Sequence, residues 1–297
     1  MKERVLVTGA GGFIGRKLIE LFVQKDYRVH GWDKFEDEHI ECIDMLDNEA
    51  VSDALQRWNP DIIIHCAGSA DVGKSVQYPD ADYAGNVTIT HNLLFALHRL
   101  KMENTRVVFL SSAGVYGNPV SLPITEDMPC NPMSPYALHK VMCEDMCQYF
   151  KENYGMNIKI ARIFSAYGVG LKKQIFWDMH VKAEKTGKLK MFGTGNESRD
   201  YIHVNDVIQA LYILAITKSD EILYNVANGE EITIRQATDW FAEFSGISSD
   251  AIIFNGVVRE GDPVNWRADI RKIKALGYRK SVDMKDGLQD YIKWVRK

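Results

Sequence analysis

The chain has 297 residues, of which 46% are hydrophobic and 26% charged, and its formal net charge is −4. A chain of this length buries a large core and forms one large domain or two unequal ones. A mildly acidic chain without a basic stripe argues against a nucleic-acid-binding protein. No apolar run approaches the length of a membrane span, and the chain opens directly on a predicted strand. We therefore expect neither a transmembrane segment nor a signal peptide.

The cysteines indicate the compartment. There are five, an odd number, and they lack the spacing of metal ligands: Cys42, Cys66, Cys130, Cys143 and Cys147. They predict reduced thiols in a cytoplasmic protein without a metal site.

The first 22 residues predict a strand, a glycine turn and an amphipathic helix. Residues 4–8 read RVLVT, residues 9–15 read GAGGFIG, and residues 16–22 read RKLIELF. Such a turn lets the backbone approach a pyrophosphate closely at a helix N-terminus. We expect Gly9 to make the tight turn, Gly12 to allow the approach and Gly15 to permit close contact between helix and strand. Phe13 and Ile14 complete this predicted cofactor-binding loop.

The next strand, over residues 28–33, ends in Asp33. A carboxylate about 20 residues after the glycines suits the ribose hydroxyls of adenosine and would repel a 2′-phosphate. The pattern therefore favours NAD over NADP. A short third strand over residues 40–45 ends in Asp44 and Met45, which we place beside the adenine ring.

Strands and helices alternate through the first half of the chain. Helices are predicted over residues 48–58, 80–100 and 134–154, and buried strands over residues 61–67, 106–110 and 157–163. Repeated β–α units imply an α/β fold with a Rossmann-like, doubly wound parallel sheet and its ligand at the carboxyl ends of the strands.

The pattern loosens after residue 165. We assign residues 1–165 to a dinucleotide-binding domain, to which residues 204–226 return. A smaller C-terminal α/β substrate-binding lobe takes residues 166–203 and 227–297.

Residues 68–75 read GSADVGKS and match the P-loop pattern. A P-loop needs a long helix that opens at its Lys-Ser pair, but Tyr78-Pro79 interrupts the chain within one turn. We therefore do not expect NTP hydrolysis. His65, in the apolar strand before this loop, is expected to be a packed core residue rather than a catalyst.

Three residues predict redox chemistry on an alcohol. Ser112 follows a buried strand, and Tyr136 and Lys140 share one face of a helix. A phenol is a poor base at neutral pH, but a cation about 4 Å away stabilises a phenolate by roughly 4 kcal/mol at an effective dielectric constant of about 20. Lys140 supplies that cation, and Ser112 holds the substrate hydroxyl and the developing oxyanion. Such a set removes an alcohol proton while a hydride leaves to nicotinamide.

These motifs resemble the extended short-chain dehydrogenase/reductases of the NAD-dependent epimerase/dehydratase family. The matching stretches read TGAGGFIG at 8–15, SSAGVYG at 111–117, SPYALHK at 134–140, RDYIHVND at 199–206, REGD at 259–262 and ADI at 268–270. Within the family, residues 72–79 and Asn86-Val87 are most similar to UDP-glucose 4-epimerases.

The resemblance implies several contacts. Ala67, Gly68 and Asn86 would line the NAD site, and Tyr136 and Lys140 would also contact the cofactor. Arg199 and Arg259 would grip the pyrophosphate of a nucleotide-sugar substrate, and Ser165 and Asp262 would also bind that substrate. Ser112 and Tyr136 would contact the sugar. The family also implies a homodimer formed through the helices at 80–100 and 134–154.

Three departures from the family pattern bear on the substrate. Ser165 stands where the epimerases usually carry Asn, and Ala70 lies near the place of a typical lysine. Ser112-Ala113-Gly114 replaces the Thr-Asp-Glu of sugar 4,6-dehydratases, so we do not expect dehydration.

The sequence thus predicts an NAD-dependent nucleotide-sugar 4-epimerase that oxidises C4 transiently and returns the hydride to the other face, with a UDP-hexose as the expected substrate. One alternative is an NAD(P)H-dependent reductase of a nucleotide-4-keto-6-deoxysugar. Another is a non-catalytic NAD-binding sensor, against which the intact Ser112, Tyr136 and Lys140 argue. Asp33 favours NAD and hence the epimerase.

Overall fold

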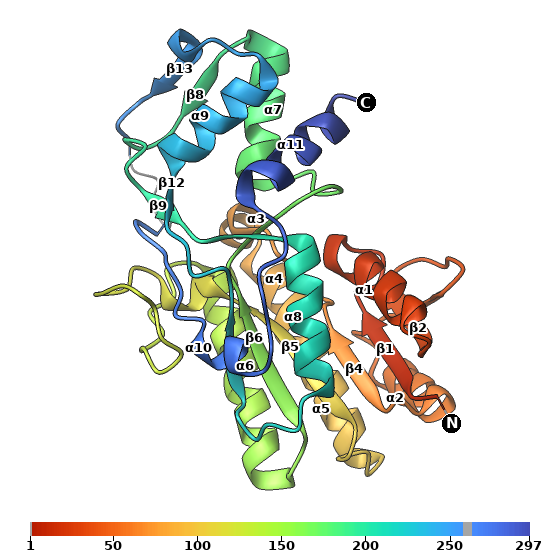
Figure 1. Cartoon of the computed structure of the whole chain (residues 1–297). Helices are drawn as coiled ribbons and strands as arrows, with labels where there is room; N and C mark the ends of the chain where they lie inside the picture. Colours follow the sequence, from red (N-terminus) through yellow and green to blue (C-terminus); the bar gives the residue numbers. More distant parts are fainter. Residues whose placement is uncertain (1, 258–262) are drawn as a thin grey trace. The chain divides into compact units, whose positions relative to one another are not determined.

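The computed structural model describes residues 2–257 and 263–297 (Figure 1). The chain forms two compact units, each assembled from separate stretches of the sequence. The first unit comprises Met1–Val115, Pro132–Arg162 and Ile208–Tyr224. The second comprises Tyr116–Asn131, Ile163–Val207 and Asn225–Lys297.

A seven-stranded sheet in the order β11-β6-β5-β4-β1-β2-β3 organises the first unit. Its strands are β1 (Arg4–Thr8), β2 (Arg28–Asp33), β3 (Ile40–Cys42), β4 (Ile62–His65), β5 (Arg106–Ser112), β6 (Ile158–Ile163) and β11 (Leu223–Val226). The five strands from β3 to β5 pair in parallel. The strand order reverses between β1 and β4, which is where a doubly wound Rossmann-like sheet binds its ligand.

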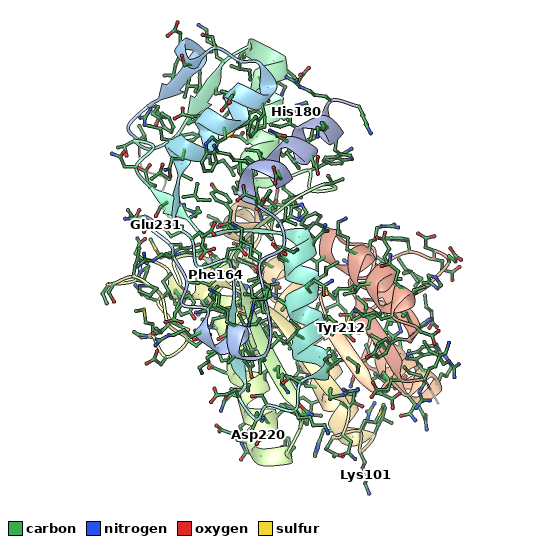
Figure 2. The ribbon with its side chains drawn as sticks, in the orientation of Figure 1. Lys101, Phe164, His180, Tyr212, Asp220 and Glu231 are labelled. Atoms are coloured by element: carbon green, nitrogen blue, oxygen red, sulfur yellow. The ribbon has the colours of Figure 1, made fainter. Side chains whose placement is uncertain are left out.

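Helices cover both faces of this sheet. They are α1 (Phe13–Gln24), α2 (Asn48–Trp58), α3 (Val72–Gln77), α4 (Pro79–Tyr83), the π-helical turn η1 (Ala84–Thr88), α5 (Ile89–Arg99), the 3-10 turn η2 (Ala113–Tyr116), α6 (Pro135–Tyr154) and α8 (Val204–Ile216). On one face, α2, α5 and α6 pack in a cluster with Leu6, Ile63 and Val107. On the other face, α1 meets α8, where the ring centroids of Phe22 and Tyr212 lie 5.6 Å apart. Figure 2 labels Tyr212 on α8. Consecutive residues of β1 and β4 are buried. Because side chains alternate across a strand, both faces of these strands are therefore covered.

The second unit is a smaller α/β assembly. Its paired strands are β7 (Ser165–Tyr167) with β10 (Tyr201–His203), β9 (Ser198–Arg199) with β12 (Ile232–Thr233), and β8 (Leu189–Met191) with β13 (Ile252–Phe254). Its helices are α7 (Gln174–Thr186), α9 (Ile234–Ser245), the 3-10 turn η3 (Ser249–Ala251), α10 (Arg271–Ala275) and α11 (Met284–Val295). The buried carboxylate of Asp200 accepts hydrogen bonds from the backbone N–H groups of Asn228, Gly229 and Ala268. Asp200 thereby joins its own segment to two distant segments of this unit.

Two predicted elements differ from the structure. The helix expected over residues 80–100 is divided into α4, η1 and α5, because a π-helical turn interrupts it. The strand expected over residues 40–45 ends at Cys42. The carboxylate of Asp44 accepts a hydrogen bond from the N–H of Leu46 at 2.9 Å, and such an Asx turn redirects the chain.

The compact units also differ from the predicted domain boundaries. Residues 116–131 lie in the second unit, and the segment that returns to the first unit starts at Ile208. The N–H of Ile124 donates to the carbonyl oxygen of Arg267 at 2.7 Å, and the N–H of Asp269 donates to that of Ile124 at 2.8 Å. Because these hydrogen bonds join residues far apart in the sequence, no local sequence pattern could have predicted where residues 116–131 lie. The division into a cofactor part and a substrate part stays a prediction.

Candidate active site

The glycine turn between β1 and α1 contains two close backbone approaches. Gly9 has a φ of +66°, and a Cβ there would lie 2.7 Å from the backbone nitrogen of Ala67. A Cβ at Gly15 would lie 2.2 Å from the carbonyl oxygen of Gly9. The turn therefore packs against both the segment after β4 and the first turn of α1, and only glycine fits at either position.

The N-terminus of α1 is open to an anion. Gly12 is the cap residue and offers no side-chain hydrogen bond, and the first turn holds no acidic residue. The N–H groups of this turn, which starts at Phe13 and includes Ile14, point out of the helix end and favour negative charge. This is the arrangement expected for a pyrophosphate site.

Asp33 at the end of β2 holds the glycine turn. Its Oδ2 accepts a hydrogen bond from the N–H of Gly11 at 2.8 Å, and its Oδ1 accepts one from the N–H of Lys34 at 2.7 Å. The Phe35 ring covers the turn, since a Cβ at Gly11 would lie 2.2 Å from Phe35 Cζ. The N–H of Ile43 donates to the carbonyl oxygen of Asp33 at 2.9 Å, and so brings the chain just before Asp44 and Met45 beside it.

Gly68 lies under two polar groups after β4. A Cβ at Gly68 would lie 2.8 Å from Asn86 Oδ1 and 3.4 Å from Lys140 Nζ. Within residues 2–257 and 263–297, Asn86 Oδ1 is buried and accepts no hydrogen bond. Lys140 Nζ donates to the carbonyl oxygen of Leu110 at 2.9 Å, which leaves further N–H groups of the ammonium. An acceptor and a donor thus face the same small space.

Ser112, Tyr136 and Lys140 come together in the first unit. A Cβ at Gly114 would lie 3.3 Å from Ser112 Oγ and 3.9 Å from Tyr136 Cε1. Lys140 Nζ lies 6.0 Å from the centroid of the Tyr136 ring. The three side chains therefore lie together near the end of β5, and their chemical roles stay predictions.

Comparison with known proteins decides the family. The family described as "NAD dependent epimerase/dehydratase family" matches residues 5–227. The chain belongs to the NAD-dependent epimerase/dehydratase family.

Proteins similar to this chain include epimerases and a dehydratase. A UDP-glucose 4-epimerase of Mycolicibacterium smegmatis is 30% identical, with 99% of this chain and 98% of the relative covered. A dTDP-D-glucose 4,6-dehydratase of Bos taurus is 28% identical, with 99% and 89% covered. Among solved structures, the UDP-glucose 4-epimerase of Thermus thermophilus in complex with NAD matches with a TM-score of 0.87 and 28% identity, covering 99% of both chains.

The residues present fit the cofactor named by the family. The open N-terminus of α1 suits a pyrophosphate, and the carboxylate of Asp33 suits ribose hydroxyls. The unpartnered Asn86 Oδ1 is able to accept a hydroxyl proton, and Lys140 is able to donate to a hydroxyl oxygen. Sugar hydroxyls both donate and accept, so a ribose would satisfy both groups at Gly68.

The P-loop match at residues 68–75 has a structural role in this family member. The helix that follows is α3, which spans only Val72–Gln77, and the Asp71 carboxylate accepts the N–H of Lys74 at 3.0 Å. An acidic cap there repels a phosphate. Ser75 Oγ accepts the N–H of Tyr136 at 3.1 Å, so Ser75 instead anchors the start of α6.

Two of the predicted substrate residues, Ser112 and Tyr136, lie in the first unit, and the other four lie in the second unit or outside the described residues. Ser165 is the first residue of β7, and Arg199 ends β9, with its guanidinium carbon 5.6 Å from the Trp266 ring centroid. Arg259 and Asp262 lie outside the described residues. The substrate contacts of all four residues stay predictions.

Sequence reasoning did not predict that Gly11, Phe35 and Arg16 contact one another at the glycine turn. Arg16 Nε donates to the carbonyl oxygen of Gly11 at 3.1 Å, and its guanidinium carbon lies 5.7 Å from the Phe35 ring centroid. The extra glycine between Gly9 and Gly12 was the available signal, since a third small residue in the turn indicates a further close contact.

Two other predictions concern metals and membranes. Among the described residues, no group of His, Cys, Asp and Glu side chains is arranged to hold a metal ion. The helices of the described residues are all too short or too polar to cross a membrane. Cys42, Cys66, Cys143 and Cys147 form no disulfide, and burial raises the pKa of the Cys66, Cys143 and Cys147 thiols.

Proposed function

We propose that the protein is an NAD-dependent nucleotide-sugar 4-epimerase with a UDP-hexose as its substrate. The observation that carries this proposal is the meeting of Ser112, Tyr136 and Lys140 at the end of β5, beside the Gly68 and Asn86 pair. A base, a cation and a hydroxyl group at a Rossmann ligand edge suit the removal of an alcohol proton.

The side chains divide the work on the sugar. The chemistry that NAD would supply here is reversible hydride transfer at sugar C4. Tyr136 takes the proton of the C4 hydroxyl and returns it, and the Lys140 ammonium stabilises the phenolate that forms. Ser112 Oγ, which accepts the N–H of Gly114 at 3.1 Å, can donate its own proton to the developing C4 carbonyl oxygen. Burial of Tyr136 and Lys140 strengthens these electrostatic interactions.

The pyrophosphate of a nucleotide-sugar substrate is negatively charged and is bound best by cationic side chains. Arg199 and Arg259 would bind the pyrophosphate bidentately, and Ser165 and Asp262 would contact the sugar.

Ser112-Ala113-Gly114 lacks the carboxylates of a 4,6-dehydratase at this position, which argues against water elimination.

The alternative to epimerisation is a single reduction of a 4-keto sugar by external NAD(P)H, which would use the same three residues. The carboxylate of Asp33 disfavours the 2′-phosphate of NADPH and so supports the epimerase. A non-catalytic NAD sensor would have no chemical use for the three residues together.

One experiment separates these functions. The purified protein is analysed for bound NAD and then incubated, without added cofactor, with UDP-glucose, UDP-galactose and their N-acetyl forms. We expect bound NAD and interconversion of one 4-epimer pair. Turnover only with NADPH and a 4-keto sugar would instead establish the reductase. NAD binding without turnover of either kind would establish the sensor.

Tyr136→Phe tests the mechanism. We expect the variant to keep its NAD and to lose turnover by at least about 10³-fold, because the proton acceptor is gone. Tyr154→Phe, at the far end of the same helix, is the matched control and should turn over normally. Activity of Tyr136→Phe equal to that of the control would refute the assigned base.

The same proposal includes a homodimer in the cytoplasm. On α6, Leu138, Met142 and Tyr149 are exposed and share one helix face, and Tyr83 and Phe95 are exposed on α4 and α5. An exposed apolar face of this kind favours burial against a second copy. Cys42, Cys66, Cys143 and Cys147 carry thiols outside any disulfide, which supports a reducing compartment.

A further inference from the structure

A buried chain of hydrogen bonds connects the end of β1 to η1. Thr8 Oγ1 accepts the N–H of Ala67 at 3.2 Å and lies 2.7 Å from His65 Nδ1. The other ring nitrogen, His65 Nε2, lies 3.2 Å from Thr90 Oγ1. The Thr90 hydroxyl donates to the carbonyl oxygen of Asn86 at 2.7 Å. His65, at its centre, is only 1% exposed.

The donors in this chain point in one consistent direction. The Thr90 proton goes to a carbonyl oxygen, so Thr90 Oγ1 has to accept from His65 Nε2, which therefore carries a proton. His65 Nδ1 is then free to accept the Thr8 hydroxyl proton. A neutral ring with its proton on Nε2 satisfies every group in the chain.

The surroundings keep the ring neutral. Burial lowers the pKa of His65 to about 3, and the charge of Lys140 acts in the same direction. The neighbouring Cys66 and Cys143 thiols stay protonated because burial raises their pKa. The Phe109 ring, with its centroid 5.8 Å from that of His65, adds no charge.

The chain of hydrogen bonds ends at Asn86, the residue that faces Gly68. The carbonyl oxygen of Asn86 is held by Thr90 and also accepts the Cys143 thiol at 3.5 Å. The Asn86 side chain donates to the carbonyl oxygen of Asp82 at 3.1 Å and leaves Oδ1 unpartnered over Gly68. At its other end, the chain holds the N–H of Ala67, directly before Gly68. Both sides of the Gly68 and Asn86 contact are thus fixed from the same imidazole.

We propose that His65 is a positioning residue, whose neutral ring sets the distance between Asn86 and Gly68 and so holds the groups that receive the NAD ribose. This inference rests on the proposed function, because it assigns NAD to these groups. It changes the status of His65 from a packed core residue to a group that acts on the site through Thr8 and Thr90.

The first test replaces His65, the central residue of the chain of hydrogen bonds. His65→Phe keeps a ring and removes both hydrogen bonds, while His65→Gln keeps one donor and one acceptor. We expect His65→Phe to release NAD about 10²-fold faster and to lower kcat by a similar factor, with KM for the nucleotide sugar changed by less than about threefold. His65→Gln should recover part of both losses.

Thr90 provides a second, independent pair of variants. Thr90→Val should reproduce the faster NAD release, and Thr90→Ser should behave like the unaltered protein. Thr88→Val is the matched control, because it makes the same change within η1 at a hydroxyl outside the chain of hydrogen bonds. Amide hydrogen exchange over residues 84–88 should rise in His65→Phe and Thr90→Val but not in Thr88→Val.

The outcomes are distinguishable from failure of the proposed function. If the unaltered protein retains NAD but converts no nucleotide sugar, the epimerase proposal fails while NAD release and hydrogen exchange still test His65. If His65→Phe fails to fold, the Thr90→Val and Thr90→Ser comparison decides. NAD release that is equal in Thr90→Val, Thr90→Ser and Thr88→Val would overturn the inference and leave His65 as core packing.

Discussion

At the scale of single residues, Gly15 shows how close the backbone turn and the helix lie. A Cβ there would meet the carbonyl oxygen of Gly9 at 2.2 Å and Ala10 Cα at 2.8 Å, and backbone atoms cannot rotate away as a side chain can. We expect Gly15→Ala to destabilise the protein by about 1–3 kcal/mol and to lose bound NAD. Urea unfolding and the NAD content of the purified protein measure the two effects.

Gly73→Ala is the control for this prediction. A Cβ at Gly73 would come no closer than 3.6 Å to any other group, which is ordinary contact. It should leave both stability and NAD content unchanged. NAD content in Gly15→Ala equal to that of Gly73→Ala would contradict the packing argument.

His65 makes a prediction about acid stability. Its pKa falls from an ordinary 6.5 to about 3 in the folded chain, because burial opposes the charged ring. Below about pH 6.5 the unfolded chain therefore binds a proton that the folded chain does not. The free energy of unfolding consequently decreases as the pH falls from about 6.5 towards 3. His65→Asn should remove up to about 1.4 kcal/mol per pH unit from that slope.

The measurement compares urea unfolding of the two proteins between about pH 4 and about pH 7. His91→Asn, at an exposed histidine, serves as the control and should keep the slope of the unaltered protein. A parallel pH dependence in His65→Asn and the unaltered protein would show that folding leaves the pKa of His65 unchanged.

At the scale of elements, α6 is fixed at several points along its length. Ser134 caps it by accepting the N–H of Ala137 at 3.2 Å, as the Ser-Pro start predicted. One turn beyond Lys140, Glu144 accepts two hydrogen bonds from Arg162 Nε, at 3.0 and 3.2 Å, and one from its Nη2 at 2.6 Å. Ser111 also donates to Glu144, so the helix is tied to β5 and β6.

Breaking this buried pair should be costly. Glu144→Gln leaves the Arg162 guanidinium without its counter-charge, and both side chains are buried. We expect a loss of about 3–5 kcal/mol in the free energy of unfolding, measured in urea. Glu152→Gln, on the exposed part of the same helix, should cost less than about 0.5 kcal/mol. Equal losses in the two variants would contradict a buried ion pair.

At the scale of the whole molecule, the exposed face of α6 predicts self-association. Leu138 is 48% exposed and lies one turn from Met142 and its apolar neighbours. We expect a dimer by light scattering, and Leu138→Arg should yield a monomer because a charge would be buried in the interface. Val120→Arg, at an apolar residue of the other unit that is 98% exposed, should remain dimeric. A monomeric unaltered protein would refute the dimer.

The sequence predicted the parts of the fold that local patterns encode. Helix α2, the Ser134-Pro135 start of α6 and the run of buried parallel strands follow from periodicity and capping signals. The π-helical turn η1 was missed, because Asn86 and its neighbours have an ordinary helical pattern. The path of residues 116–131 was missed as well, because its hydrogen bonds reach Arg267 and Asp269.

The sequence by itself determined the family, the glycine turn with Asp33, and the identity of the groups that meet at the end of β5. Those features depend on spacing along one strand or one helix, which the chain encodes locally. Only the tertiary structure decided that His65 joins Thr8 to Thr90 and that Asn86 Oδ1 lies unpartnered over Gly68. Those contacts depend on how β1, β4 and η1 pack together, because hydrogen-bond partners are chosen by distance in space rather than in sequence.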